Sequence, residues 1–287
     1  MPNTDLTEKD LQQWLGKSQH HEDVLYPGPA HLLAATLDRD HVQFAQGDTL
    51  PILWHWLYFL SAERLSSLAP DGHPTKGGFL PPIPLPRRMW AGSRLRFQQP
   101  LCLAQRVKKS STIKSIQFKA GRSGQLAFVC VVHEISNAAG VAVIEEQDLV
   151  YRSPALPSAL PPAPLKSSVV ADFSLSVAPS AVMLFRYSAL TFNAHRIHYD
   201  RDYAMAEEGY PGLVVHGPLL ATLMMELVAG EFVGRPVLSF EFRALQPVFE
   251  GAEIKVCGKL PDGDGKGELW IENGVGEVCM RGLLVLG

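Results

Sequence analysis

The sequence predicts an α+β fold built from two similar halves, in each of which an antiparallel sheet wraps a buried helix. Three observations support this prediction. Both halves of the chain contain a series of strand-like runs separated by turn residues. An apolar segment precedes the runs in each half, and a stretch rich in Pro, Ser and Ala lies between the halves.

Bulk composition restricts the class of protein. The chain has 287 residues, of which 46% are hydrophobic and 19% charged, as expected for a globular protein with large buried surfaces. A formal net charge of −3 gives no electrostatic footprint for nucleic acid. The polar N-terminus and the lack of a run of about 18 apolar residues predict neither export nor a membrane span, so we expect a cytoplasmic protein. Four cysteines without a CxxC pair are expected to be free thiols.

The Pro-rich stretch divides the chain. Residues 153–180 are predicted to form an extended linker, because such a sequence supplies neither a central strand nor a helix interior. Residues 1–152 then form an N-terminal half, and residues 181–287 form a C-terminal half.

The two halves share one order of elements. The segment 95–100 opens the strands of the first half and 242–247 those of the second, so Pro100 and Pro247 mark matching points 147 positions apart. This weak internal repeat favours a duplicated domain. The expected strands that follow are 112–119, 126–136 and 141–152 in the first half, and 253–260, 268–272 and 278–285 in the second.

The apolar segment 216–229 is predicted to be a buried helix. Pro218 stands in its first turn and Gly230 just past its end, and the segment is apolar nearly all round. Residues 51–60 are its shorter expected counterpart, although helix and strand patterns are hard to separate there. A buried helix followed by antiparallel strands that wrap it is the hot-dog architecture. The tandem arrangement therefore predicts a double hot dog, with two sheets and two buried helices.

Polar and titratable side chains gather just before the second helix. Asn193, His195, His198, Asp200 and Asp202 fall within ten residues. Asp200 is expected to cap a short helix, so the residues before it form a loop whose side chains can converge on a cavity. A histidine in such a loop suits general acid/base chemistry at neutral pH. Structural roles for the single histidines are the alternative, and the clustering favours function.

The start of the apolar helix adds a second chemical feature. Backbone N–H groups at Gly217 and beyond point out of the helix N-terminus and could stabilise a developing enolate oxygen. His216 is expected to support the helix entry and, with His195, to line the substrate site. The spacing His195-x-x-His198-x-Asp200 matches no established metal motif, so we predict that no metal is bound.

The pattern Asn193-x-His195-x-x-His198-x-Asp200, with His216-Gly217 downstream, resembles the signature of the MaoC-like, (R)-specific enoyl-thioester hydratases. In that family an Asp and a His five residues later activate a water, and a Gly amide in the following helix region holds the thioester oxygen. The resemblance implies that His198 is the catalytic histidine and that Gly217 lies at the oxyanion site.

One position departs from the family pattern, because Asn193 stands where the family has its Asp. An amide cannot accept a proton. We therefore expect Asn193 to orient the water while His198 works alone. Asp200 or Asp202 is the alternative source of a carboxylate.

The first half extends the resemblance. The segment 71–92 is similar to the long N-terminal insert of the itaconyl-CoA and mesaconyl-C4-CoA hydratases, and its Pro-Arg-Arg-Met-Trp run is fairly specific for that group. Thr191-Phe-Asn193 fits the same group, so the asparagine is interpreted as a subfamily trait. Eukaryotic mitochondrial 3-hydroxyacyl-thioester dehydratases share parts of these motifs.

The resemblance implies a hydro-lyase that adds water reversibly to an unsaturated dicarboxylic acyl-CoA, converting itaconyl-CoA or mesaconyl-C4-CoA to citramalyl-CoA. The N-terminal half would shape the pocket, and the C-terminal half would carry the catalytic residues. The free carboxylate of such a substrate needs a cationic partner if it is buried. Arg87 and Arg88, close to Trp90 in the insert, are the candidates, and Arg243 is a further one.

An acyl-CoA is the expected partner, and because CoA is part of the substrate we expect no separate cofactor. A homodimer or a larger homo-oligomer is expected to be possible. Two other functions fit the same fold. One is a 3-hydroxyacyl-thioester dehydratase of fatty-acid synthesis, and the other is a hot-dog thioesterase or acyl-CoA-binding module.

Overall fold

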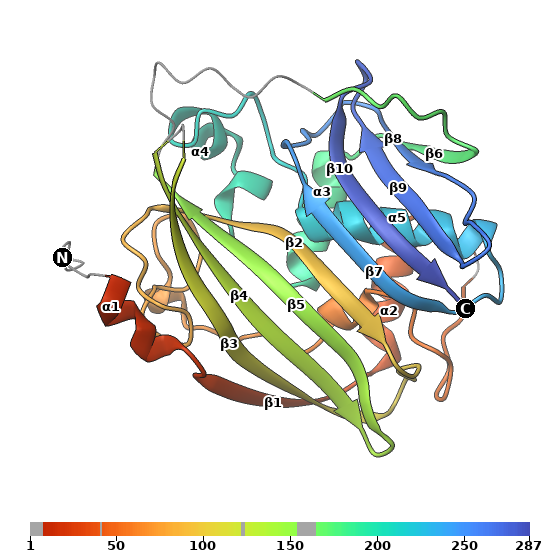
Figure 1. Ribbon diagram of the computed structural model, residues 1–287, viewed down its shortest axis with the longest axis horizontal. Helices are drawn as coiled ribbons and strands as arrows, with labels where there is room; N and C mark the ends of the chain where they lie inside the picture. Colours follow the sequence, from red (N-terminus) through yellow and green to blue (C-terminus); the bar gives the residue numbers. More distant parts are fainter. Residues whose placement is uncertain (1–7, 41, 122–123, 154–164) are drawn as a thin grey trace.

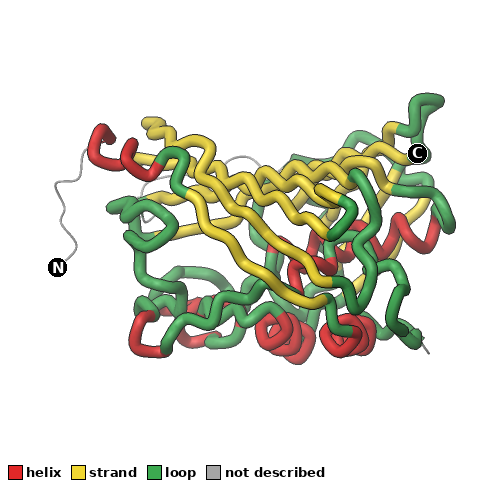
Figure 2. The backbone as a smooth tube through the Cα atoms, turned by 90° about the horizontal axis from the view of Figure 1, so that it is seen from below, coloured by secondary structure: helices red, strands yellow, loops and turns green. Residues whose placement is uncertain are grey.

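A computed structural model describes residues 8–40, 42–121, 124–153 and 165–287 of the chain. Its described strands form one antiparallel sheet in the order β1-β3-β4-β5-β2-β7-β10-β9-β8-β6 (Figure 1). Figure 2 shows this sheet as a curved layer, with the helices and long loops packed against one of its sides. None of the described helices is long and apolar enough to cross a membrane.

The first half supplies five strands of the sheet. It begins with the short helix α1 and a 3-10 turn, and α2 follows its first strand. The elements are α1 (Glu8–Leu11), β1 (Ser18–Val24), α2 (Pro27–Thr36), β2 (Arg87–Phe97), β3 (Arg106–Gly121), β4 (Gly124–Asn137) and β5 (Gly140–Arg152).

The second half repeats this layout with shorter strands. Its strand order, β6-β8-β9-β10-β7, matches β1-β3-β4-β5-β2 of the first half, so the sheet has the same order from either edge. The elements are β6 (Phe173–Val177), α3 (Ala181–Leu190), α4 (Arg201–Ala206), α5 (Gly217–Glu231), β7 (Val237–Ala244), β8 (Ile254–Gly258), β9 (Lys266–Glu272) and β10 (Val278–Leu286). The internal repeat expected from the positions of Pro100 and Pro247 is therefore a structural repeat.

The two sheets expected from the sequence join edge to edge along β2 and β7. Their register runs from Gly92 opposite Arg243 to Arg96 opposite Ser239. The backbones come close at Gly92, where a Cβ atom would lie 2.2 Å from the carbonyl oxygen of Phe242. This antiparallel contact makes one continuous sheet out of the two halves.

The centre of the molecule is the helix α5. It is apolar on nearly all sides, and the sheet and α3 enclose it, as expected for a core helix. Its fully buried side chains include Leu219, Ala221 and Met224. They pack with Leu95 of the first half and Phe240 of the second in one hydrophobic core.

The first half has no equivalent long helix among its described residues. The expected counterpart at 51–60 contains only a 3-10 turn, Trp54–Leu57. Leu53 before the turn and Phe59 after it have left-handed backbone angles, with φ of 70° and 56°, which stops a right-handed helix from continuing. The expectation of a second central helix is wrong, and α2, which the sequence analysis did not anticipate, is the longest described helix of this half.

The stretch 153–180 is not linker throughout. Residues 154–164 lie outside the described residues, and Phe173–Val177 forms β6, which pairs with β8 at the edge of the sheet. Edge strands need only one hydrogen-bonded neighbour, so the Pro-rich context did not reveal this strand.

Candidate active site

A large cavity lies between the two halves, at the N-terminal end of α5. Its volume is about 740 Å³, which suits a small-molecule site. Both halves contribute polar groups to its wall. The first half supplies His73, Arg88 and Trp90, and the second supplies Asn193, His195, His198, His216 and Gly217.

His198 sits in a 3-10 turn, Arg196–His198, that is fixed against the segment before α5. Its Nδ1 donates a hydrogen bond to the carbonyl oxygen of Val214 at 2.7 Å, and the Val214 N–H donates to the carbonyl oxygen of Ile197 at 2.9 Å. A carbonyl only accepts, so Nδ1 carries the proton and the neutral ring keeps a lone pair on Nε2. Burial lowers the pKa of His198 to about 4. The side chain is therefore neutral at physiological pH.

His216 lies directly against His198 at the entry to α5. The two rings stack with centroids 3.6 Å apart and an interplanar angle of 20°. Nε2 of His216 is hydrogen-bonded to the Ser188 hydroxyl at 2.8 Å, while its buried Nδ1 has no hydrogen-bond partner among the described residues. Burial, together with His198, holds the pKa of His216 well below its usual value. The stack is thus a pair of neutral imidazoles.

Asn193 stands at the turn that follows α3. Its backbone N–H donates to the carbonyl oxygen of Ser188 at 2.8 Å, and its Oδ1 accepts from the backbone N–H of His195 at 3.0 Å. Phe192, just before it, has a left-handed φ of 49°. The side-chain oxygen is thus used within the loop, which leaves the Asn193 amide group as the donor for a ligand in the cavity.

His195 connects this loop to the first half of the molecule. Its ring lies edge-on to His198 at 5.4 Å and against His73 at 4.0 Å. Burial lowers the pKa of His195, and the neighbouring His73 and His198 add to this effect. Four histidines therefore form one row along the cavity wall, in the order His73, His195, His198 and His216.

The insert expected to shape the pocket reaches the loop that holds Asn193, His195 and His198 through Asp71. The backbone N–H of Arg196 donates to the carbonyl oxygen of Asp71 at 2.9 Å. Gly72 has a φ of +89°, and a Cβ atom there would overlap the carbonyl oxygen of Ala194. Only glycine allows this close approach. The contact places His73 beside His195.

Sequence analysis did not single out His73 as a site residue. The signal was the run Asp71-Gly-His73 inside the insert, where a carboxylate and an imidazole flank a glycine. In the structure, Nδ1 of His73 is hydrogen-bonded to Oδ2 of Asp71 at 3.0 Å, and the His73 N–H donates to Oδ1 at 2.9 Å.

Asp71, His73 and His195 are of the residue types that bind metal ions. Donor atoms of Asp71, His73 and His195 lie within 4.8 Å of one another. Asp71 and His73, however, direct their donor atoms at each other in a hydrogen bond. We interpret the group as a hydrogen-bonded carboxylate–imidazole pair beside a second imidazole, and the absence of a bound metal stays a prediction.

The two alternative carboxylates lie away from the cavity lining. Asp200 caps α4 by accepting the N–H of Tyr203 at 3.0 Å, and it forms an ion pair with Arg196 at 2.7 Å. Asp202 is exposed. Neither side chain belongs to the cavity wall.

The three candidate arginines have different surroundings. Arg88 lines the cavity, and the structure places its charge close to His73. Arg87 forms an ion pair with Glu208 at 2.8 Å and also donates to that residue's backbone carbonyl. Arg243 lines a separate, smaller pocket with Trp270 and Arg281. Of the three, Arg88 is the one that lines the cavity, and its role as a cation for the substrate stays a prediction.

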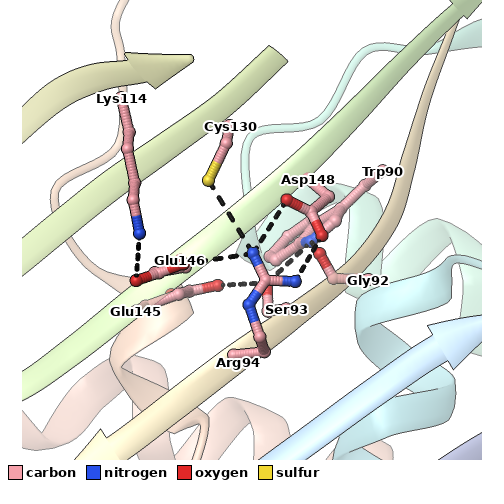
Figure 3. Close-up of polar contacts among 9 residues, drawn as sticks. All are labelled: Trp90, Gly92, Ser93, Arg94, Lys114, Cys130, Glu145, Glu146 and Asp148. Carbon is pink, nitrogen blue, oxygen red and sulfur yellow. Dashed lines mark hydrogen bonds and ion pairs between the residues drawn. The ribbon is translucent and has the colours of Figure 1, made fainter. Parts of the chain in front are cut away.

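Trp90 is held in the cavity wall by a buried polar network (Figure 3). Its Nε1 donates to the Ser93 hydroxyl at 2.9 Å, and that hydroxyl donates to Oε1 of Glu145 at 2.8 Å. Trp56 donates to the other carboxylate oxygen of Glu145 at 3.0 Å and packs edge-on against Trp90. This network fixes the indole of Trp90 beside the cavity.

The start of α5 provides backbone donors to the same cavity. Gly217 is its first residue and Pro218, which has no N–H group, is the second. The first amides of a helix lack partners within the helix and carry a partial positive charge. Gly217 also lies beside the backbone of Trp90, since a Cβ atom there would be 3.7 Å from the Trp90 carbonyl oxygen.

Comparison with known families and relatives adds independent observations. Residues 53–250 match the family model described as hydroxyacyl-thioester dehydratase type 2. The chain is 46% identical over 260 residues to the mesaconyl-C(4)-CoA hydratase of Chloroflexus aurantiacus, covering 90% of this chain and 92% of that one. It is 31% identical to the mitochondrial hydroxyacyl-thioester dehydratase type 2 of Schizosaccharomyces pombe, covering 88% and 91% of the two chains.

Solved structures share the fold at low sequence identity. HtdX of Mycobacterium tuberculosis matches with a TM-score of 0.66 at 17% identity, covering 94% of this chain and all of that one. A protein from the same organism that is described as having a double hotdog fold matches with a TM-score of 0.58 at 13% identity, covering 95% and 96%. These matches confirm the α+β double hot dog expected from the sequence.

Proposed function

The chain belongs to the hydroxyacyl-thioester dehydratase type 2 family, a family of hydratase-type enzymes, and from this premise we propose that it hydrates an unsaturated dicarboxylic acyl-CoA. Itaconyl-CoA and mesaconyl-C4-CoA are the favoured substrates, each giving citramalyl-CoA. The relative with 46% identity, a mesaconyl-C(4)-CoA hydratase, supports this class. CoA enters as part of the substrate, and no separate cofactor is part of the proposal.

The single observation that carries the proposal is the geometry around His198. Its Nδ1–H is held by the Val214 carbonyl, so the lone pair of Nε2 is available to a water in the cavity. The amide of Asn193 is a donor that orients this water, and the first amides of α5 supply donors to the thioester oxygen.

In the simplest scheme, written for mesaconyl-C4-CoA, whose double bond is conjugated with the thioester, His198 takes a proton from the water, and the water oxygen forms a bond with Cβ. The π electrons move onto the thioester oxygen, where amides near Gly217 stabilise the negative charge. One such donor contributes about 3 kcal/mol in the best-measured enzymes. The same proton then passes from His198 to Cα, and the carbonyl is restored.

Arg88 supports a dicarboxylic substrate over a simple enoyl group. It is the one candidate arginine whose side chain lines the cavity, while Trp90 provides an apolar wall next to it. A guanidinium group can bind a buried carboxylate with two hydrogen bonds. The substrate's free carboxylate is therefore placed at the β2 side of the cavity.

The test is an assay with itaconyl-, mesaconyl-C4- and crotonyl-CoA that follows enoyl absorbance and free thiol together. We expect enoyl absorbance to fall without thiol release, and His198→Ala to abolish this change while thermal unfolding stays cooperative. Thiol release would indicate a thioesterase, and neither signal would indicate a binding module. Crotonyl-CoA preferred over both dicarboxylic substrates would favour the fatty-acid-type dehydratase, which the match to the Schizosaccharomyces pombe enzyme keeps as the second candidate. Ultracentrifugation would show whether the chain forms the homo-oligomer we propose.

A further inference from the structure

The pair Asp71–His73 forms a carboxylate-backed imidazole on the cavity wall. Oδ2 of Asp71 lies 3.0 Å from Nδ1 of His73, and the backbone N–H of His73 donates to Oδ1. The carboxylate accepts, so Nδ1 is the donor and a neutral His73 has its lone pair on Nε2. His73, but not Asp71, lines the cavity. This is the arrangement in which a carboxylate orients a histidine and stabilises its charged form.

His198 lacks such a carboxylate partner. The group beyond its Nδ1 is the neutral carbonyl of Val214, and its ring is covered on one face by the neutral ring of His216. An imidazolium formed there would be buried without a counter-charge, which is costly. The pKa of His198, lowered to about 4, reflects this cost. His198 can therefore hold a water through Nε2, but its environment disfavours the imidazolium that forms when it takes the water's proton.

Asp71 gives His73 the opposite environment. Burial raises the pKa of Asp71, but its hydrogen bonds to His73 outweigh this effect and lower the pKa to about 2. The residue is therefore a carboxylate in the working pH range. Burial is the largest effect on His73 and leaves its pKa below the usual value, while the hydrogen bond and charge of Asp71 oppose this lowering. Of the described histidines in the row, His73 is the one whose proton would face a carboxylate.

We propose that His73, positioned by Asp71, is the group that carries the proton during hydration and so replaces the carboxylate that Asn193 cannot provide. The inference rests on the proposed function and assigns a further catalytic residue to the same site: His73 takes the proton that the simplest scheme gives to His198, and His198 keeps the role of holding the water. Asp71 is a positioning residue, because it acts through His73.

The proposed step is balanced. An O–H bond of the water held by His198 breaks, and its proton moves to Nε2 of His73 while the water oxygen bonds to Cβ. The π electrons move through Cα to the thioester oxygen. The proton then passes from Nε2 of His73 to Cα as the enolate electrons form the new C–H bond. His73 returns to its neutral form, and no other reactant is consumed.

Several charged or titratable groups set the proton affinity of the pair. Arg88 on β2 and Lys76 in the insert lower the pKa of His73, and Asp71 raises it. The groups that face Asp71 or His73 from the surrounding elements are Lys76, Arg88, His195, His198, Tyr203 and Glu208. Asp71 is the only carboxylate among them that bonds directly to His73 in the part of the chain the structure describes.

The test compares Asp71→Asn with Asp202→Asn, an exposed aspartate in the same region, on the enoyl-CoA that the parent enzyme hydrates best. Neutral His73 is the active form, so the rate falls as pH drops through its pKa. Removing the Asp71 charge lowers that pKa. We expect kcat of Asp71→Asn to fall about 100-fold, with KM nearly unchanged and the acid limb of the pH profile moved to lower pH. Asp202→Asn should behave as the parent.

Chemical rescue separates catalysis from a structural role. His73→Ala leaves space next to the cavity, and added imidazole should restore hydration to His73→Ala but not to His198→Ala, whose loss removes the water site. Two results would overturn the inference: an unmoved acid limb with an Asp71→Asn rate equal to that of Asp202→Asn, or loss of parent activity on chelation that zinc restores. A parent enzyme that hydrates none of the thioesters would instead contradict the proposed function.

Discussion

At the scale of single residues, the row of histidines is held uncharged by the protein around it. His198 and His216 are buried, stack on each other and lack a carboxylate partner. A neutral imidazole with a defined tautomer is what a water-binding site needs, because its lone pair is then always available. The arrangement lowers the stability of the folded state when the pH falls.

The pH dependence of stability should reveal these histidines. The pKa of folded His198 is lowered from 6.5 to about 4, so the unfolded chain binds its proton first and stability is lost as pH falls from about 6.5 to about 4. A shift of this size corresponds to a loss of up to about 3 kcal/mol. Urea unfolding across this pH range should show a smaller loss for His198→Gln than for the parent. The exposed His20 gives the control His20→Gln, and an equal slope in all three proteins would contradict the prediction.

Arg88 should decide between substrates. If it binds the free carboxylate, Arg88→Leu removes a charge-assisted interaction that contributes about 1.5–3 kcal/mol, or about 10- to 100-fold in kcat/KM. This loss should appear with itaconyl-CoA and mesaconyl-C4-CoA and be absent with crotonyl-CoA. Arg87→Leu is the matched control, because Arg87 is paired with Glu208 and should affect stability without changing the substrate ratio. An equal loss on all substrates would assign Arg88 to CoA binding or to the fold.

At the scale of elements, β2, β5 and the turn Trp54–Leu57 are joined by one buried carboxylate. Glu145 accepts from Ser93 and Trp56, and the imidazole of His55 lies 3.5 Å away. Burial would raise the pKa of Glu145, but His55, His133 and Trp56 outweigh it and lower the pKa to about 2. The next residue, Glu146, faces the other side of the sheet and pairs with Arg94 and Lys114 (Figure 3).

Substitutions at these two adjacent glutamates of β5 should therefore reduce the free energy of unfolding by different amounts. Glu145→Gln leaves one buried donor without its carboxylate oxygen and should reduce the free energy of unfolding by about 2–4 kcal/mol. Glu146→Gln alters partly exposed ion pairs and should cost less than about 1 kcal/mol. Urea denaturation measures both. Because Glu145 orients Trp90 through Ser93, its variant should also raise KM, and similar costs for the two variants would refute the buried network.

The elements with regular patterns were predictable from sequence. Alternating runs between turn residues indicated β3, β4, β5 and β8 to β10, and the apolar segment indicated α5. The strands β1 and β6 were missed. They lie at the sheet edges, where a strand can form with only a weak alternation of apolar and polar residues. His198, Asn193 and Gly217 could be named from the sequence because they match a family pattern, and the structure brings them to one cavity. His73 was not named, because 122 positions separate it from His195 and tertiary contacts, such as those of Gly72 with Ala194 and of Asp71 with Arg196, bring the two rings together.

At the scale of the whole molecule, the duplication creates two related cavities of which one carries the histidines. Residues 88–90 and 244–248 line the main cavity, and their counterparts 147 positions away, 235–237 and 97–101, line a second cavity of about 640 Å³. The described lining of this second cavity includes one histidine, His55, and is otherwise mainly apolar. The two halves have thus diverged in chemistry while keeping their relation across β2 and β7.

A substitution at Gly92 tests whether the stability and activity of the protein depend on the junction of β2 with β7. Gly92 follows an irregularity in the β2–β5 register next to Trp90, and a Cβ atom there would lie 2.2 Å from the Phe242 carbonyl oxygen in β7. Gly92→Ala must separate the strands and should reduce the free energy of unfolding by at least about 2 kcal/mol. It should also lower hydration, because Trp90, two residues before Gly92, lies beside Gly217 at the start of α5. Gly230→Ala, in α5 with open space around it, is the control and should stabilise the protein by about 0.5–1 kcal/mol. If Gly92→Ala unfolded at the same urea concentration as the parent with full activity, the halves would be independent units and the site would not need their junction.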